Sequence, residues 1–262
     1  MKHTNFFAAL LVASSFFIGC DKDDNDDYYN EQPPAVQANV VKGSGDIAPF
    51  LSQFRSLLGD PVNTTPGQTS GRREVNWDGV PANALNPFPL SFFNDTSAAG
   101  PNGRKRGLVY VNTGVTIRLD TTDFAEIDPS YAAQFDAFSS KKILTSIGSP
   151  VSEVVFKVPG TNTDAFIKGF GVVFTDVDDA ASTSLEFYNG NKSLGVFKAP
   201  ARAAGSSFSF LGVHFPNEKI TRVKITNGNG VLAAGVKDVS DGGQKDLVAM
   251  DDFFYSEPVS IQ

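Results

Sequence analysis

Six acidic residues in three short stretches of the chain could act together in chemistry. They are Glu74, Asp78, Asp176, Asp178, Asp251 and Asp252. Carboxylate oxygens are the ligands that calcium prefers, and two carboxylates about 5–10 Å apart across an open cleft can hydrolyse a glycosidic bond. A third alternative is an ion pair, because Arg72 and Arg73 lie in the same stretch as Glu74. The sequence leaves all three alternatives open, and a calcium ion held by these acids is the one that would give the site a ligand.

Nucleophilic and zinc chemistry lack the residues that they need. Histidine is the usual proton shuttle near neutral pH, and beyond the N-terminal region the chain has only His214, within FLGVHFP. A lone histidine in an apolar strand is typical of a packed, hydrogen-bonded residue. Cys20 is the only cysteine, so thiolate zinc sites and Cys-His catalysis are excluded. We therefore predict no catalytic residues and expect a protein that is not an enzyme.

Trp77, the only tryptophan, is the candidate ligand-binding residue. It lies in the polar stretch GRREVNWDGVP, which we expect to form the first strand of a sheet. In that strand Trp77 would be buried in the core, and the alternative is an exposed platform that stacks on the apolar face of a sugar. The stretch GPNGRKRG at residues 100–107 places three positive charges in a predicted loop. This loop is a solvated tip or, alternatively, a site for an anionic glycan.

The N-terminus resembles a bacterial lipoprotein signal. An apolar run ends in FFIGC, similar to signals that are cut before a cysteine whose thiol then carries lipid, here Cys20. The acidic run that follows, DKDDNDDYYNEQPPA, cannot bury enough apolar surface to fold and is similar to the surface-export signal of Bacteroidetes lipoproteins. We expect a signal peptide at 1–19 and a disordered acidic tether at 20–44. The lipid anchor would place the protein in the bacterial outer membrane, facing the exterior.

Residues 45–262 are predicted to form one all-β domain. About eleven short stretches rich in β-branched and aromatic residues alternate with turn sequences such as NGNK and NGNG. This pattern predicts an antiparallel β-sandwich of jelly-roll type. One short helix is expected within DIAPFLSQFRSLLGD, between a capping Asp46 and Gly59, and it would cover an open end of the sandwich. Jelly rolls commonly pair their first and last strands, which would bring GRREVNWD beside MDDFFYSE, where Asp251 and Asp252 are expected on opposite strand faces.

The order of the stretches GRREVNWDGVP, GFGVVFTDVD and VAMDDFFYSEP resembles a group of bacterial exported and surface proteins, some with PEP-CTERM-like sorting tails. This resemblance implies a fold and an exported location, and no activity. The net charge of −7 disfavours nucleic acid as a partner. We expect a surface-anchored binding or adhesion domain that is stabilised by calcium and recognises a glycan or a surface protein. The alternatives are a carbohydrate-active hydrolase and a structural component of the cell surface.

Overall fold

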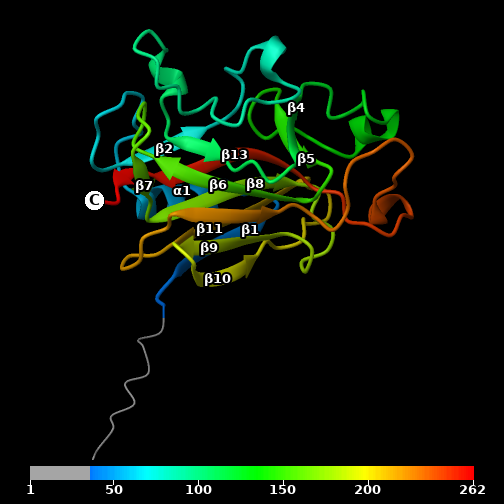
Figure 1. The fold of residues 1–262 in the computed structure, drawn as a ribbon. Helices are drawn as coiled ribbons and strands as arrows, with labels where there is room; N and C mark the ends of the chain where they lie inside the picture. The colour runs from blue at the N-terminus through cyan, green and yellow to red at the C-terminus, as the bar shows by residue number, and fades with distance from the viewer. Residues whose placement is uncertain (1–35) are drawn as a thin grey trace, which may run out of the picture. The chain divides into compact units, whose positions relative to one another are not determined.

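The computed structural model describes residues 36–262, which form an all-β domain of two antiparallel sheets (Figure 1). The first sheet contains, in spatial order, β1 (Asn39–Ser44), β11 (Phe208–His214), β8 (Gly169–Thr175), β13 (Ala249–Ser256), β5 (Ile143–Ile147) and β4 (Thr116–Asp120), with β2 (Arg72–Val75) also paired to β13. The second sheet contains β10 (Lys192–Lys198), β9 (Ser184–Asn189), β12 (Arg222–Thr226), β6 (Val151–Lys157), β7 (Asp164–Phe166) and β14 (Val259–Ser260), with β3 (Leu108–Tyr110) paired to β6.

The two sheets enclose the main core between them. Alternate residues of β8, among them Phe170 and Val172, point into this core, as does Phe187 of β9 in the other sheet. The rings of Phe170 and Phe156 meet between the sheets with their centroids 6.0 Å apart. The period of two in β8 therefore predicts correctly which side chains face the main core, although the whole strand is buried.

The one α-helix within residues 36–262, α1 (Ala48–Leu58), covers the outer face of the first sheet. Its buried residues Leu51, Phe54 and Leu58 form the predicted apolar stripe, and the helix ends at Gly59 as expected. The prediction that this helix covers an open end of the sandwich is wrong, because its stripe packs against outward side chains of β8, β11 and β13. A Cβ atom at Gly212 of β11 would lie 2.7 Å from the Phe54 ring. Glycine at this position therefore allows the helix to lie close to the strand.

Several predicted boundaries differ from the structure. β1 lies within the range predicted as a tether, so the domain begins earlier than residue 45 and GRREV is its second strand. The stretch PLSFF forms turns because Pro89 cannot donate a ladder hydrogen bond. GVLAAGV is also irregular, since glycine and alanine offer little side chain to pack in a strand. The predicted loop at 128–144 contains the expected helical turn, η3 (Pro129–Ala133), and runs into β5.

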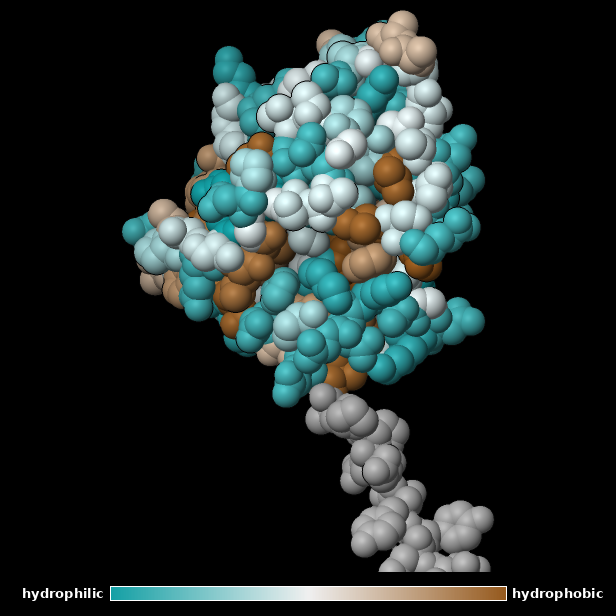
Figure 2. Space-filling model, turned by 90° about the vertical axis from the view of Figure 1, so that its left-hand side faces the viewer, coloured by the Kyte–Doolittle hydropathy of each residue, from teal (hydrophilic) through white to brown (hydrophobic). Residues whose placement is uncertain are grey.

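The surface of the domain is mixed in polarity. On the face shown in Figure 2, hydrophobic residues appear in several patches that hydrophilic residues separate. Among residues 36–262 we find no helix with the length and apolar character that a membrane span requires. The remaining short elements are η1 (Ala82–Ala84), η2 (Asn102–Arg104) and η4 (Val239–Asp241), which lie in the connections that carry the sites described below.

Candidate metal centre

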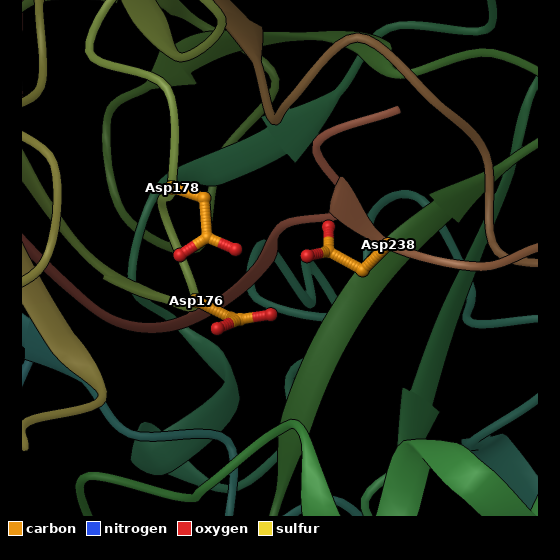
Figure 3. A group of neighbouring side chains, drawn as sticks. All are labelled: Asp176, Asp178 and Asp238. Atoms are coloured by element: carbon orange, nitrogen blue, oxygen red, sulfur yellow. The ribbon is translucent and has the colours of Figure 1, made fainter. Parts of the chain in front are cut away.

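Three carboxylates from two segments far apart in the sequence meet beside the end of β8. Asp176 and Asp178 follow this strand directly, and Asp238 precedes the short helix η4. Ligand oxygens of the three side chains all lie within 4.8 Å of one another. Figure 3 shows the carboxylates of Asp178 and Asp238 facing each other, with Asp176 beside them. We call these three residues the Asp triad.

Local backbone conformation and hydrogen bonds fix the positions of Asp176 and Asp238 in the Asp triad. Asp176 has a φ of 66°, in the left-handed region, which aspartate and asparagine tolerate better than most residues. Asp238 caps η4 by accepting hydrogen bonds from the backbone N–H and hydroxyl of Ser240, both at 2.7 Å. Its other oxygen accepts the N–H of Leu247 at 2.7 Å. These contacts hold Asp238 in one position against Asp178.

Arg202 binds the outer oxygens of two members of the Asp triad. Its Nε lies 2.8 Å from Oδ1 of Asp176 and 2.7 Å from Oδ1 of Asp178. The second oxygen of each carboxylate, Oδ2, is buried and has no hydrogen-bond partner among the described residues. A buried carboxylate oxygen without a partner is costly. The two Oδ2 atoms therefore leave hydrogen-bonding capacity unsatisfied next to Arg202.

The electrostatics of the Asp triad reflect this shortage of positive charge. Burial raises the pKa of Asp176 to about 7, with Asp178 adding to the effect and Gln134 and Arg202 opposing it. Burial also raises the pKa of Asp178, and the close carboxylate of Asp238 acts in the same direction. The pKa of Asp238 is lowered, because the Leu247 N–H and the contacts from Asp178 and Ser240 outweigh the effect of its burial. One arginine thus faces three carboxylates whose charges repel each other.

The donor set of the Asp triad suits calcium better than a transition metal. Oxygens bound to one calcium ion at about 2.4 Å can be at most about 4.8 Å apart, and the ligand oxygens of the Asp triad lie within that limit. Asp176 also lines a cavity of about 170 Å³, together with Gln134 and Ser240. This cavity offers room for the water ligands that complete a calcium shell. The site contains neither histidine nor cysteine, the ligands that zinc prefers.

The sequence predicted Asp176 and Asp178 but missed Asp238 and Arg202. Asp238 lies in GVKDVSDGG, where its spacing to Ser240 is the signal of a capped turn. Nothing in that signal indicates that the turn folds back onto the end of β8. A further acid, Asp246, accepts the N–H groups of Asp178 and Asp179 at 3.1 and 3.0 Å and so supports the loop from behind.

Glu74 and Asp78 lie apart from the Asp triad and have their own partners. Glu74 accepts hydrogen bonds from Arg55 and Arg72, at 2.8 and 2.7 Å for the closest pairs. Asp78 accepts the backbone N–H of Lys141 at 3.2 Å. For Glu74 the structure therefore supports the arginine alternative rather than a metal ligand.

Asp251 and Asp252 lie together in a β-bulge of β13. Met250 pairs with Phe174 and Phe253 with Val172, so the two acids share one position of the ladder. The bulge breaks the alternation that the sequence predicted, and both carboxylates accept a hydrogen bond from the hydroxyl of Ser139. Burial and the neighbouring Asp252 raise the pKa of Asp251 to about 8. These two acids form a buried pair and do not join the Asp triad.

The prediction that the GRREVNWD and MDDFFYSE stretches lie side by side is confirmed, because β2 pairs with β13. Arg73 of β2 forms an ion pair with Glu257, which the sequence interpretation did not single out. The closest distance is 2.7 Å and the two side chains are 0% and 1% exposed.

Trp77 lies in the core and is 1% exposed. Its Nε1 donates a 2.8 Å hydrogen bond to the carbonyl of Asp251, and the rings of Phe93 and Phe253 pack edge-on against it. The structure therefore agrees with the core alternative. The proposed role as a ligand-binding platform needs an exposed indole face, which this environment does not provide.

Two other predictions concern His214 and the N-terminal lipid anchor. His214 is half-buried near Asn39, with 3.4 Å between its Nδ1 and the Asn39 amide nitrogen, and burial lowers its pKa. Cys20, the predicted lipidation site, and the predicted signal peptide lie outside the described residues.

In sequence comparisons, no protein-family model matches the chain, and no curated protein matches it either.

Proposed function

We propose that the protein is a calcium-binding domain of jelly-roll type that acts in binding or adhesion at the cell surface. The observation that carries this proposal is the pair of buried Oδ2 atoms of Asp176 and Asp178, which have no hydrogen-bond partner among residues 36–262, in a group of three aspartates whose ligand oxygens lie within 4.8 Å of one another. A divalent cation between them would supply the missing partner and offset the repulsion among three carboxylates. The ion would join the loop after β8 to the turn at η4 and stiffen that end of the domain.

The jelly-roll assignment is supported by the path of the chain between the sheets. From β5 onward, the chain repeatedly leaves one sheet for the other, with β8, β11 and β13 in the first sheet and β9 and β12 in the second. Such crossing is typical of jelly rolls, in which two Greek keys share a sandwich.

The binding role and the surface location rest on other observations. The lipoprotein-like signal at Cys20 supports a surface anchor. The buried position of Asp251 and Asp252, 0% and 8% exposed, disfavours a hydrolytic pair in an open cleft. A surface domain that holds a cation and lacks such a pair is best suited to binding.

Calcium titration tests the proposal directly. Isothermal titration should show one calcium site, and calcium at about 100 times its Kd should stabilise the domain by about 2.7 kcal/mol. This stabilisation raises the melting temperature, and removal of the calcium by a chelator should lower it again. Asp176→Asn should lose the calcium response and still fold, because asparagine also tolerates a positive φ at this position. Asp238→Asn should lose the response as well.

Asp241→Asn is the matched control. Asp241 lines the same cavity as Asp176 but is exposed and stands outside the Asp triad, so this variant should keep the full calcium response. The proposal is wrong if calcium changes neither heat nor melting temperature in the wild-type protein. It is equally wrong if Asp176→Asn and Asp238→Asn respond to calcium as the wild type does.

A further inference from the structure

Two adjoining cavities lie in the long connection between β2 and β3. This connection, residues 76–107, contains only the short turns η1 and η2 and runs across the top of the view in Figure 1. The cavities have volumes of about 220 and 490 Å³, and Phe92 and Arg104 line both of them. The larger cavity falls in the range of about 300–1,000 Å³ that is typical of small-molecule sites. A connection of this length without regular structure is also typical of binding loops.

Arg104, which lines both cavities, has spare hydrogen-bonding capacity. Its guanidinium carbon lies 4.3 Å from the centre of the Phe92 ring, so the ring supports the cation from one side. Its nearest carboxylate is Asp95 at 3.9 Å, too far for a hydrogen bond. Oδ1 of Asp95 accepts the N–H and hydroxyl of Ser97, and Oδ2 is the oxygen that lies 3.9 Å from Arg104. The Arg104 side chain, 39% exposed, thus presents oriented donors that bond to no other side chain in residues 36–262.

Arg106 lines the smaller cavity and is also free of carboxylates. Its Nε and Nη1 donate to the backbone carbonyls of Gly103 and Glu74, at 3.2 and 3.1 Å. These bonds hold the guanidinium in place and leave Nη2 without a partner among the described residues. The carboxylate of Glu74, which also lines this cavity, is engaged by two other arginines. The smaller cavity is therefore locally positive, although the chain as a whole carries a net charge of −7.

The larger cavity has a different character, because neutral polar groups line it together with one carboxylate, that of Asp95. The exposed side chains of Asn83, Ser91 and Thr96 line it. Amides and hydroxyls are the groups that hydrogen-bond to the hydroxyls of a sugar, since they can both donate and accept. A ligand that spans both cavities would therefore meet polar neutral groups on one side of Arg104 and positive charge on the other.

We propose that these adjoining cavities bind an acidic oligosaccharide, with the anionic group between Arg104 and Arg106 and a neighbouring sugar ring in the larger cavity. Planar guanidinium groups bind carboxylate and sulfate with paired hydrogen bonds. The site is separate from the Asp triad, so its failure would leave the calcium proposal intact.

Titration of the purified full-length protein with three tetrasaccharides tests this site. The probes are tetragalacturonate, which carries carboxylates, a heparin tetrasaccharide, which also carries sulfates, and neutral maltotetraose. The titrations are performed with a chelator, because carboxylated sugars themselves bind calcium. At least one acidic probe should bind, more weakly at high salt, and maltotetraose should not. Comparison of the two acidic probes distinguishes a carboxylate from a sulfate as the recognised group.

Arg104→Gln and Arg106→Gln should each weaken the binding of the acidic probe by about tenfold or more. Lys105→Gln is the matched control, because Lys105 is in the same loop and carries the same charge but lines neither cavity. This variant should bind as the wild type does. The proposal is overturned if no acidic probe binds at about 1 mM, if maltotetraose binds equally well, or if Arg104→Gln binds no more weakly than Lys105→Gln.

Discussion

Replacement of Glu257 by glutamine should severely destabilise the domain. Glu257 forms two hydrogen bonds with Arg73, from Nε and Nη2, both at 2.7 Å, and a third with Asn63 at 2.8 Å. Arg73 is 0% exposed, and a guanidinium cannot shed its proton at accessible pH. The variant therefore leaves a buried charge without its counter-charge, which costs about 3–5 kcal/mol. For a domain of this size, that loss lowers the melting temperature by about 6–20 °C.

Urea unfolding followed by tryptophan fluorescence provides the measurement. Trp77 is the only tryptophan and is buried, so its emission reports on the packing of the core next to β13. The unfolding midpoint should fall while the slope with denaturant stays constant. Asp164→Asn is the control, because it breaks an ion pair with Lys157 in which the acid is 72% exposed, and should cost no more than about 1 kcal/mol. If Glu257→Gln costs no more than this control, the buried ion pair does not stabilise the fold.

Three further predictions concern other parts of the chain. Because the folded state raises the pKa of Asp251 to about 8, it favours the protonated acid, so the contribution of Asp251 to stability should be greatest below about pH 4 and fall by up to about 1.4 kcal/mol per unit as the pH rises to 8. Unfolding measured across this range in saturating calcium should show a shallower slope for Asp251→Asn, and an unchanged slope would contradict the assignment. Gly212→Ala should lower the unfolding free energy by about 1–3 kcal/mol, because its added Cβ overlaps Phe54. Gly79→Ala is the control: no atom lies within 4 Å of its added Cβ, so it should change the unfolding free energy by less than about 1 kcal/mol. Equal effects of the two variants in thermal denaturation would refute the close helix packing. Cys20→Ser should move the protein from the membrane fraction to the soluble fraction and abolish palmitate labelling, and a variant that stays in the membrane would exclude the lipid anchor.

The strands with regular alternation were predictable from the sequence, and those without it were not. Phe170 and Val172 alternate with residues that face α1, and β-branched and aromatic content alone identifies the strand. β1 was missed because NVVKGS is short, polar in part and adjacent to the acidic run. Its place in the sheet comes from pairing with β11, a contact between residues about 170 positions apart. Such tertiary pairing leaves little local signal.

The candidate site was predictable only in part for a related reason. The acids after β8 could be predicted as metal ligands because a carboxylate-rich turn ends a hydrophobic strand. Their partner Asp238, however, is 60 residues beyond Asp178 in the chain. For Asp251 and Asp252, the β-bulge decides the outcome, because one extra residue in the strand moves both carboxylates to Ser139. Sequence alternation assumes an unbroken ladder and cannot detect this change.

The position of β13 has a consequence for the order in which the domain can assemble. This strand lies in the middle of the first sheet, between β8 and β5 and also paired with β2, yet all but one of the other strands precede it in the chain. The sheet therefore cannot grow outward strand by strand as the polypeptide is made. Until residues 249–256 become available, β8 and β5 lack their shared neighbour and expose apolar edges that are prone to mispairing. Folding should be slow and nearly all-or-none, and it should begin only when almost the entire chain is present.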